Sequence, residues 1–412
     1  MPHLAINGGP VTRTQPYPSW PVYTVDDARA VSEVVMEGKW GSSREGRVAK
    51  FQEKFAAYQD ADHGICVTNG TTALILALQV VGIEPGDEVI VPAYTFIATA
   101  NAVLMVNAVP VFVDMEPETY NIDPDQVEAA VTPKTRAIIP VHFAGLPADL
   151  DRLSAIARKH SLAIVEDAAQ AHGARWDEKG VGAQGAIGTF SFQGSKNLNA
   201  GEGGIMLTND DKVAGIARSL ANCGRAEDGL GYNHYHLAGN NRMPELQGAL
   251  LLSQMERLEE QTQLRSENAE YLSEQLGMID GINPTNSPQK ATRHARHLYI
   301  FRYNTDAFGG TPKQRFIAAL RAEGIPTSPG YGTPLYQQPV FVEKNFGAYA
   351  HPASMAREFG SMHLPETERA CSAEAVWFSQ NVLLGSKEDM DDIVRAISKI
   401  RERRNELGGA SR

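Results

Sequence analysis

Cysteine is scarce in this sequence of 412 residues, and the scarcity excludes two kinds of stapled scaffold. The three cysteines, Cys66, Cys223 and Cys371, are far apart and form no Cys-x-x-Cys pair. Neither a disulfide framework nor a zinc knuckle fits that pattern, and we expect no metal site. The N-terminal residues also lack the charged and apolar segments of a signal peptide. We therefore expect a cytoplasmic protein in a reducing compartment.

The sequence also has fewer basic than acidic residues, and its apolar runs are short. The 38 Lys and Arg residues are outnumbered by 49 Asp and Glu residues, which gives a formal net charge of −11. That balance is unfavourable for binding phosphate backbones, so we expect no nucleic-acid partner. Apolar stretches such as residues 73–83 fall well short of the roughly 20 residues that cross a bilayer. We expect no membrane-spanning segment.

What the sequence does contain is an alternation of short β-branched runs with longer helical patterns between about residues 60 and 210. This alternation predicts βα units that feed a mostly parallel, seven-stranded sheet in a large α/β domain. The expected strands are residues 64–67, 88–91, 109–113, 137–141, 163–166, 189–192 and 204–207. The expected helices are residues 71–81, 96–105, 124–130 and 149–160.

After residue 243 the pattern changes to one long helix over residues 244–276. We expect this helix to lead out of the large domain, so that residues 1–260 form the large domain with an N-terminal arm. Residues 261–412 then form a smaller α+β domain. Its expected elements are a strand at 298–303, a helix at 312–323, a Pro- and Gly-rich loop at 324–339 and a final helix at 387–407.

The residues with chemical potential gather in two segments, 165–173 and 188–204. Asp167 ends an expected strand, and ligands bind at the carboxyl ends of strands in open α/β sheets. Lys196 follows in a Gly- and Ser-rich loop close to Ser191. A lysine and a carboxylate in this order are the groups that a pyridoxal phosphate site needs. Taken singly, a solvated lysine, a helix-capping aspartate and, for His172, a core histidine are the commoner explanations.

Two further segments follow expected strands. Gly70 and Thr71 open a helix whose free N–H groups are suited to a phosphate, although a simple helix capped by Asn69 has the same pattern. Tyr94 ends another strand, where its ring can stack on a flat cofactor or pack in the core. No Gly-x-Gly-x-x-Gly follows the first expected strand, which disfavours a nicotinamide enzyme.

At these residues the sequence resembles the DegT family of sugar aminotransferases, a branch of the fold-type-I pyridoxal phosphate enzymes. The resemblance extends over most of the chain. Its most specific part is the run Ser191-Phe192-x-x-x-Lys196-x-x-x-x-Gly201-Glu202-Gly203-Gly204. Further matching segments are residues 38–40, 51–56, 68–74, 86–92, 140–145 and 240–243.

The resemblance implies a pyridoxal 5'-phosphate cofactor and roles for the residues around it. Lys196 would bind the cofactor as a Schiff base and then move the proton between substrate carbon and cofactor. Asp167 would pair with the pyridine nitrogen, and Gln170 would lie near the phenolic oxygen. Tyr94 would stack on the ring face.

The resemblance also implies a phosphate site and a homodimer. Ser191, Gly70 and Thr71 would hold the phosphate, and Asn240 would reach it from the neighbouring subunit. The chain departs from the family's pattern in its small-domain loop, residues 326–335, where Gly330 and Gly332 stand in unusual places. Substrate contacts in that loop therefore stay open.

Residues 171–176 and 222–225 are more similar to the scyllo-inosose aminotransferases and the 3-amino-5-hydroxybenzoate synthases than to enzymes of nucleotide-linked hexoses. This similarity implies transfer of an amino group from glutamine or glutamate to a cyclic ketone, a keto-cyclitol such as scyllo-inosose or a keto-sugar. Gln170 resembles the aminotransferase side of that subgroup. A dehydrating amino-aromatic synthase and a non-catalytic regulator that binds pyridoxal phosphate are the alternatives.

Overall fold

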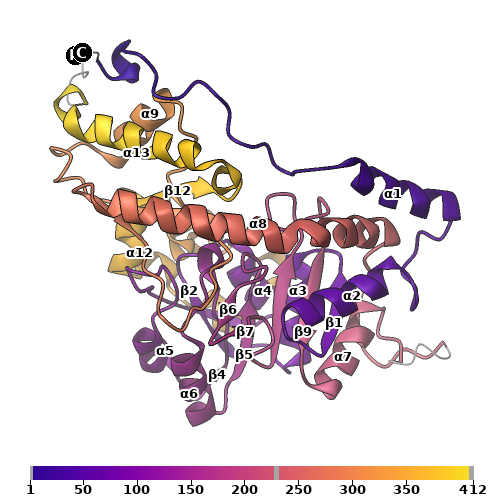
Figure 1. Cartoon of the computed structure of the whole chain (residues 1–412). Helices are drawn as coiled ribbons and strands as arrows, with labels where there is room; N and C mark the ends of the chain where they lie inside the picture. The colour runs from indigo at the N-terminus through magenta and orange to yellow at the C-terminus, as the bar shows by residue number, and fades with distance from the viewer. Residues whose placement is uncertain (1–2, 227–231, 408–412) are drawn as a thin grey trace.

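Seven strands form the central sheet of the computed structural model, which describes residues 3–226 and 232–407 (Figure 1). Their order is β1-β9-β8-β5-β4-β2-β3, with β9 antiparallel to β1 and β8 and the other pairs parallel. This confirms the mostly parallel α/β sheet expected from the sequence. The strands are β1 (His63–Val67), β2 (Glu88–Pro92), β3 (Val109–Val113), β4 (Thr135–Ile138), β5 (Ala163–Asp167), β8 (Ile187–Ser191) and β9 (Gly204–Thr208).

Helices cover both faces of this sheet, and its strands are therefore apolar along their length instead of alternating. Every residue of β2, β8 and β9 is buried. On one face Val91 packs in a cluster with residues of α3 and α4, and on the other Ile90 packs with residues of α5 and α6. The helices are α2 (Arg47–Tyr58), α3 (Gly70–Val80), α4 (Ala98–Met105), α5 (Pro124–Ala130), α6 (Leu150–His160) and α7 (Asp211–Ala221).

A single helix of 33 residues, α8 (Glu245–Gly277), crosses the molecule above the large sheet (Figure 1). At 1.5 Å per residue it is about 50 Å long. Near its start it packs against α1 (Val25–Glu37), where Ser253 and Arg257 both hydrogen-bond the carboxylate of Asp27. Toward its end it contacts the second sheet, so it joins the two parts of the fold.

The second sheet has three antiparallel strands, β10 (Ile282–Pro284), β11 (Leu298–Tyr303) and β12 (Ala375–Ser379). Its apolar core includes side chains of α9 (Lys313–Ala322) and α13 (Lys387–Glu402). The remaining elements are short: β6 (Arg175–Trp176), β7 (Lys179–Gly180), α10 (Pro339–Val342), α11 (Pro352–Met355), α12 (Pro365–Arg369) and the turns Ala5–Asn7, Phe143–Gly145, Leu335–Gln337, Gly347–Tyr349, Phe359–Ser361, Ala370–Glu374, Val382–Leu384 and Arg404–Glu406.

Two segments pack against a sheet that is formed by residues far from them in sequence. Leu4, Ile6 and Tyr17 belong to the core of the three-stranded sheet, which is built mostly from residues after 269. Conversely, aromatic residues of the segment 335–364, including Phe341 and Phe359, belong to the core of the seven-stranded sheet. In the described ranges, 3–226 and 232–407, no helix combines the length and apolar character that a bilayer crossing demands.

Candidate active site

The site begins at the carboxyl ends of β5 and β8, two neighbouring parallel strands that end at Asp167 and Ser191. Asp167 is 5% exposed, and its carboxylate accepts hydrogen bonds from Thr99 Oγ1 at 2.7 Å and from the Ala169 N–H at 3.2 Å. Burial raises the pKa of this carboxyl, although the two hydrogen bonds and the charge of Lys196 oppose the rise. No cation lies within ion-pair distance of it in the described part of the chain.

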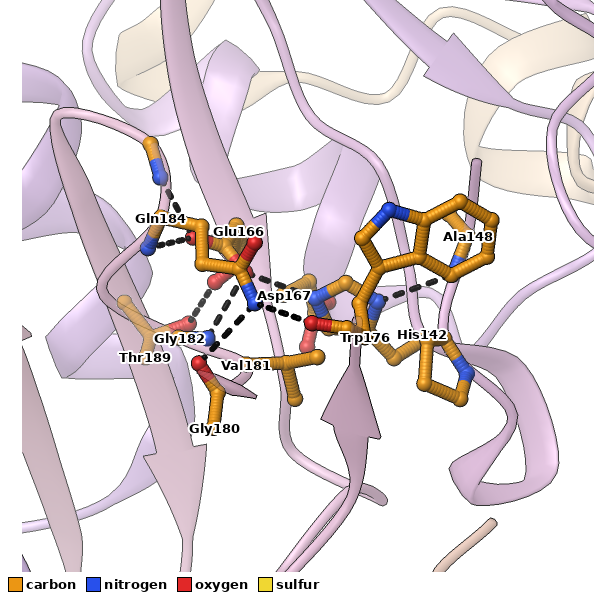
Figure 2. Close-up of polar contacts among 12 residues, drawn as sticks. His142, Ala148, Glu166, Asp167, Trp176, Gly180, Val181, Gly182, Gln184 and Thr189 are labelled. Atoms are coloured by element: carbon orange, nitrogen blue, oxygen red, sulfur yellow. Dashed lines mark hydrogen bonds and ion pairs between the residues drawn. The ribbon is translucent and has the colours of Figure 1, made fainter. Parts of the chain in front are cut away.

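Glu166, the residue before Asp167, is fully buried on the other face of β5 and anchors the loop 182–185 and His142 (Figure 2). Its carboxylate accepts hydrogen bonds from the N–H groups of Gly182, Gln184 and Gly185 at 2.6 to 2.8 Å and from His142 Nε2 at 2.9 Å. Burial alone would raise the pKa of Glu166, but these hydrogen bonds outweigh it and lower that pKa. The backbone N–H of His142 also donates to the backbone carbonyl of Asp167 at 3.0 Å. This network therefore fixes the strand end that carries Asp167.

Lys196 lies in the loop after β8, and its side chain is half-buried. Burial lowers its pKa to about 8, and the attraction of Asp167 opposes that change. Its ammonium group has no hydrogen-bond partner in residues 3–226 and 232–407. The loop is fixed on both sides of it: Trp20 Nε1 donates to the Gly194 carbonyl at 3.0 Å, and Asn197 Nδ2 donates to the Ala295 carbonyl at 2.7 Å.

The start of α3 lies against the end of β8. Asn69 caps the helix by accepting from the Thr72 N–H at 2.8 Å, and Gly70 follows as the first helical residue. A Cβ on Gly70 would stand 2.7 Å from the Cβ of Ser191, so only glycine permits this approach. The free N–H groups of the first turn, which includes Thr71, thus lie beside the Ser191 hydroxyl. This is the geometry of an anion site at a helix N-terminus.

The structure separates the two aromatic residues at the end of β2. Tyr94 is 1% exposed, and its ring contacts those of Tyr120, Phe143 and Trp377. A ring enclosed in this way has no free face for a cofactor. Phe96, two residues later, is 56% exposed, and it lies one turn before Thr99, the residue that holds Asp167.

Gln170 lies with the central residues of the site, whereas Asn240 does not. Gln170 is 6% exposed, and its Oε1 accepts from the Ala144 N–H at 2.7 Å. Asn240 is exposed, and its backbone pairs with Asn222 at the end of α7, beyond the β1 edge of the sheet. In the residues described, no hydrogen bond joins it to Lys196, Asp167 or Ser191 of its own chain.

A profile of the DegT/DnrJ/EryC1/StrS aminotransferase family matches residues 23–382, which is most of the chain. The chain belongs to this family. Among curated proteins it is 38% identical over 430 residues to an L-glutamine:2-deoxy-scyllo-inosose aminotransferase of Micromonospora echinospora, with 99% of this chain and 100% of the relative covered. It is 37% identical over 378 residues to a 3-amino-5-hydroxybenzoate synthase of Amycolatopsis mediterranei, with 91% and 94% covered.

Among solved structures, the DegT/DnrJ/EryC1/StrS chain matches a crystal structure of 3-amino-5-hydroxybenzoic acid synthase with a TM-score of 0.85. The two share 35% identity, and the match covers 95% of this chain and 100% of the other. The fold-type-I architecture and the aminotransferase class expected from the sequence are thereby confirmed, together with the subgroup that contains both relatives.

Three residues that the sequence did not single out join the site of this family member. Thr99 is fully buried and donates to Asp167, and Phe96 is the exposed ring beside it. Tyr331, in the loop after α9, lies close enough to Gln170 for that side chain to act on its hydroxyl, and its ring contacts Tyr94 with centroids 5.4 Å apart. Thr99 lies in the first turn of the helix that follows β2, and a hydroxyl at such a place was a signal that could have found it. Tyr331 is too distant in sequence for spacing to reveal it.

Proposed function

We propose that this chain transfers an amino group from glutamine to a keto-cyclitol with pyridoxal 5'-phosphate as its cofactor. One observation carries the proposal: among the described residues, the buried Asp167 carboxylate has no cation in contact and lies within electrostatic reach of Lys196, whose amine has no hydrogen-bond partner there. A protonated heterocycle between the two would satisfy both groups. The names of the relatives, which specify glutamine and an inosose, support the substrate pair.

The residues present fit the cofactor. Lys196 would bind it covalently, and Asp167 would pair with its ring nitrogen. The cradle at Gly70, Thr71 and Ser191, which a single Cβ would fill, suits its phosphate. Gln170, which is held by the Ala144 N–H, would lie near the ring's phenolic oxygen. For the ring face we propose Phe96 in place of Tyr94, because Tyr94 is enclosed by other aromatic rings.

The chain's own groups provide the proton chemistry. When bound, pyridoxal phosphate supplies an electron sink for the carbon that bears the amino group. Lys196, with a pKa near 8, can accept a proton from that carbon and return it close to neutral pH. Asp167, held by Thr99 and the Ala169 amide, would place its carboxylate against the ring nitrogen and favour the protonated form of the ring. The same pair of groups serves both halves of a ping-pong transfer.

We also propose a homodimer in which Asn240 completes the phosphate site of the partner. The loop that carries Asn240 exposes three large apolar side chains, Tyr232, Tyr235 and Leu237, at 81%, 66% and 100%. Apolar side chains clustered on one exposed loop are typical of a surface that is buried in an assembly. Asn240 has no role in the site of its own chain, which supports a role in another.

For the domains, we propose a division near residue 260, within α8. One segment on each side of this division packs on the sheet of the other domain. The N-terminal residues 4–17 pack on the small sheet, and the segment 335–364 packs on the large one. Cytoplasmic localisation is also a proposal, and the free thiols of Cys66, Cys223 and Cys371 support it.

The likeness to 3-amino-5-hydroxybenzoate synthases favours a dehydrating synthase as the second candidate. Incubating the holoenzyme with glutamine labelled with 15N at its α-amino group and with 2-deoxy-scyllo-inosose separates the candidates. Label in an aminocyclitol, with Lys196→Ala inactive, supports the aminotransferase. An aromatic product from an amino-cyclohexenone acid instead supports the synthase. Intact cofactor absorbance without turnover of either substrate supports a binding regulator.

A further inference from the structure

Three consecutive carbonyl groups in the loop 326–333 are each held by a donor from the small sheet or its helix. The Thr327 carbonyl accepts from Nε and Nη2 of Arg321 at 2.8 and 2.6 Å. The Ser328 carbonyl accepts from the Trp377 N–H at 2.9 Å, and the Ser328 N–H donates back to the Trp377 carbonyl at 2.9 Å. The carbonyl of Pro329 accepts from the first residue of α9. The backbone of this stretch is therefore fixed at every step.

That first residue is Lys313, which is 2% exposed. Its ammonium donates to three backbone carbonyls, those of Pro329 at 3.0 Å, Ala370 at 3.3 Å and Cys371 at 2.8 Å. In the described part of the chain it has no carboxylate at ion-pair distance, and burial lowers its pKa to about 8. A cation is also disfavoured at a helix N-terminus. Packing alone would favour an apolar residue here. We therefore infer that the role of the lysine is to hydrogen-bond the three carbonyls.

Gly330 follows the clamped carbonyls and turns the chain into the site. Its φ of +75° belongs to the left-handed region, and a Cβ there would stand 2.8 Å from the hydroxyl of Tyr94. Gly330, one of the two unusual glycines of this loop, is thus required by its close approach to Tyr94. Tyr331 comes next, with its ring centroid 4.9 Å from that of Trp377 and its hydroxyl within electrostatic reach of the Gln170 side chain. The charge of Asp167 also acts on Tyr331.

We propose that Lys313 is a positioning residue that fixes Tyr331 beside Gln170 in the proposed active site and so sets the affinity for the cyclic ketone. The proposal rests on the aminotransferase function proposed above. Lys313 touches neither cofactor nor substrate in this arrangement. It acts through the Pro329 carbonyl, two residues before Tyr331, and through the turn at Ala370 and Cys371, which leads into β12.

The test compares the holoenzyme with Lys313→Met and with a matched control, Lys344→Met. Lys344 also donates to a backbone carbonyl, that of Met355 at 2.9 Å, but in a surface contact with Glu358. For Lys313→Met we expect the KM for the ketone to rise about tenfold, with kcat within about threefold and cofactor absorbance unchanged. Amide exchange of the peptide 326–334 should accelerate at least tenfold while that of 298–303 stays constant. Lys344→Met should leave all these quantities unchanged.

Two results together would overturn the proposal: a fall in kcat that accompanies the rise in KM, and faster amide exchange throughout the protein. They would show that Lys313 has a structural role alone. Unchanged exchange at 326–334 would overturn it too. If Lys313→Met does not fold, Arg321→Met must show the same pattern through Thr327, and its failure to do so refutes the clamp. A wild-type protein that binds pyridoxal phosphate but aminates no ketone would instead refute the proposed function.

Discussion

Replacing Gly70 with alanine tests whether α3 and β8 together form the phosphate cradle. The new Cβ would stand 2.7 Å from the Cβ of Ser191 and 3.2 Å from both its Cα and its Oγ. Contacts under 3.0 Å do not persist, and the nearest atom belongs to a short side chain at a strand end, so the backbone must move. The first turn of α3 therefore separates from β8, and the N–H groups lose their position beside the Ser191 hydroxyl.

The expected magnitude follows from the cost of overpacking a close-packed contact, which is about 1–3 kcal/mol. Part of that cost lowers the stability of the cofactor-free protein. The part that falls on the cradle weakens pyridoxal phosphate binding, and the whole of it would correspond to about a 5- to 150-fold rise in Kd. We expect both effects, because the strained contact lies within the proposed binding site.

Two measurements on the same protein check this prediction: urea unfolding of the cofactor-free form and titration with pyridoxal phosphate followed by visible absorbance. Gly277→Ala is the matched control, because Gly277 ends α8 and a Cβ there meets nothing within 4 Å. That variant should bind the cofactor normally and be slightly more stable, by about 0.4–1 kcal/mol. Wild-type affinity and stability in Gly70→Ala would refute the close approach of Gly70 and Ser191.

Three further outcomes follow from the site. Lys196→Ala should lower the glutamine-dependent amination rate by at least about 100-fold, the lower end for loss of a general acid–base, in a steady-state assay. Thr99→Val removes a hydrogen bond to a buried carboxylate worth about 1.5–3 kcal/mol, so the pKa of Asp167 should rise further and kcat/KM should fall about 10- to 100-fold. Burial lowers the pKa of Lys196 from 10.5 to about 8, so the folded cofactor-free protein binds that proton less tightly than the unfolded chain. Its free energy of unfolding should therefore increase from about pH 8 to pH 10.5, and urea unfolding of Lys196→Met should lack that increase.

The strands of the large sheet were predictable because each is a short apolar run buried on both faces. The expected strand 109–113 and the observed Val109–Val113 coincide, as do 298–303 and Leu298–Tyr303. The helices α1, α2 and α7 and the strand β12 were missed. The apolar residues Val25, Val35 and Met36 of α1 are exposed, so burial imposes no clear period on that helix. β12 consists of four apolar residues and Ser379 after a helical turn, and periodicity alone cannot distinguish so short a run from more helix.

Within the site, spacing along neighbouring strands identified Asp167 and Ser191, because parallel strands end at one edge of the sheet. The choice between Tyr94 and Phe96 could not be made from sequence. Both follow the same strand, and the rings that enclose Tyr94 include those of Tyr331 and Trp377, which are far away in sequence. Contacts between segments more than 200 residues apart produce no local pattern in the sequence from which they could be predicted.

The N-terminal arm has a consequence for the order in which the chain is made. Arg13 is 7% exposed, and its guanidinium bonds Asp389 at 2.6 Å and Asp392 at 2.7 Å. The last partner is 379 residues away, so at 5–20 residues per second a ribosome needs about 20–75 s to synthesise it after Arg13. Throughout that interval the arm is complete but its binding surface does not exist. The small sheet is thus covered only after Asp392 has been synthesised, by a segment made 379 residues earlier.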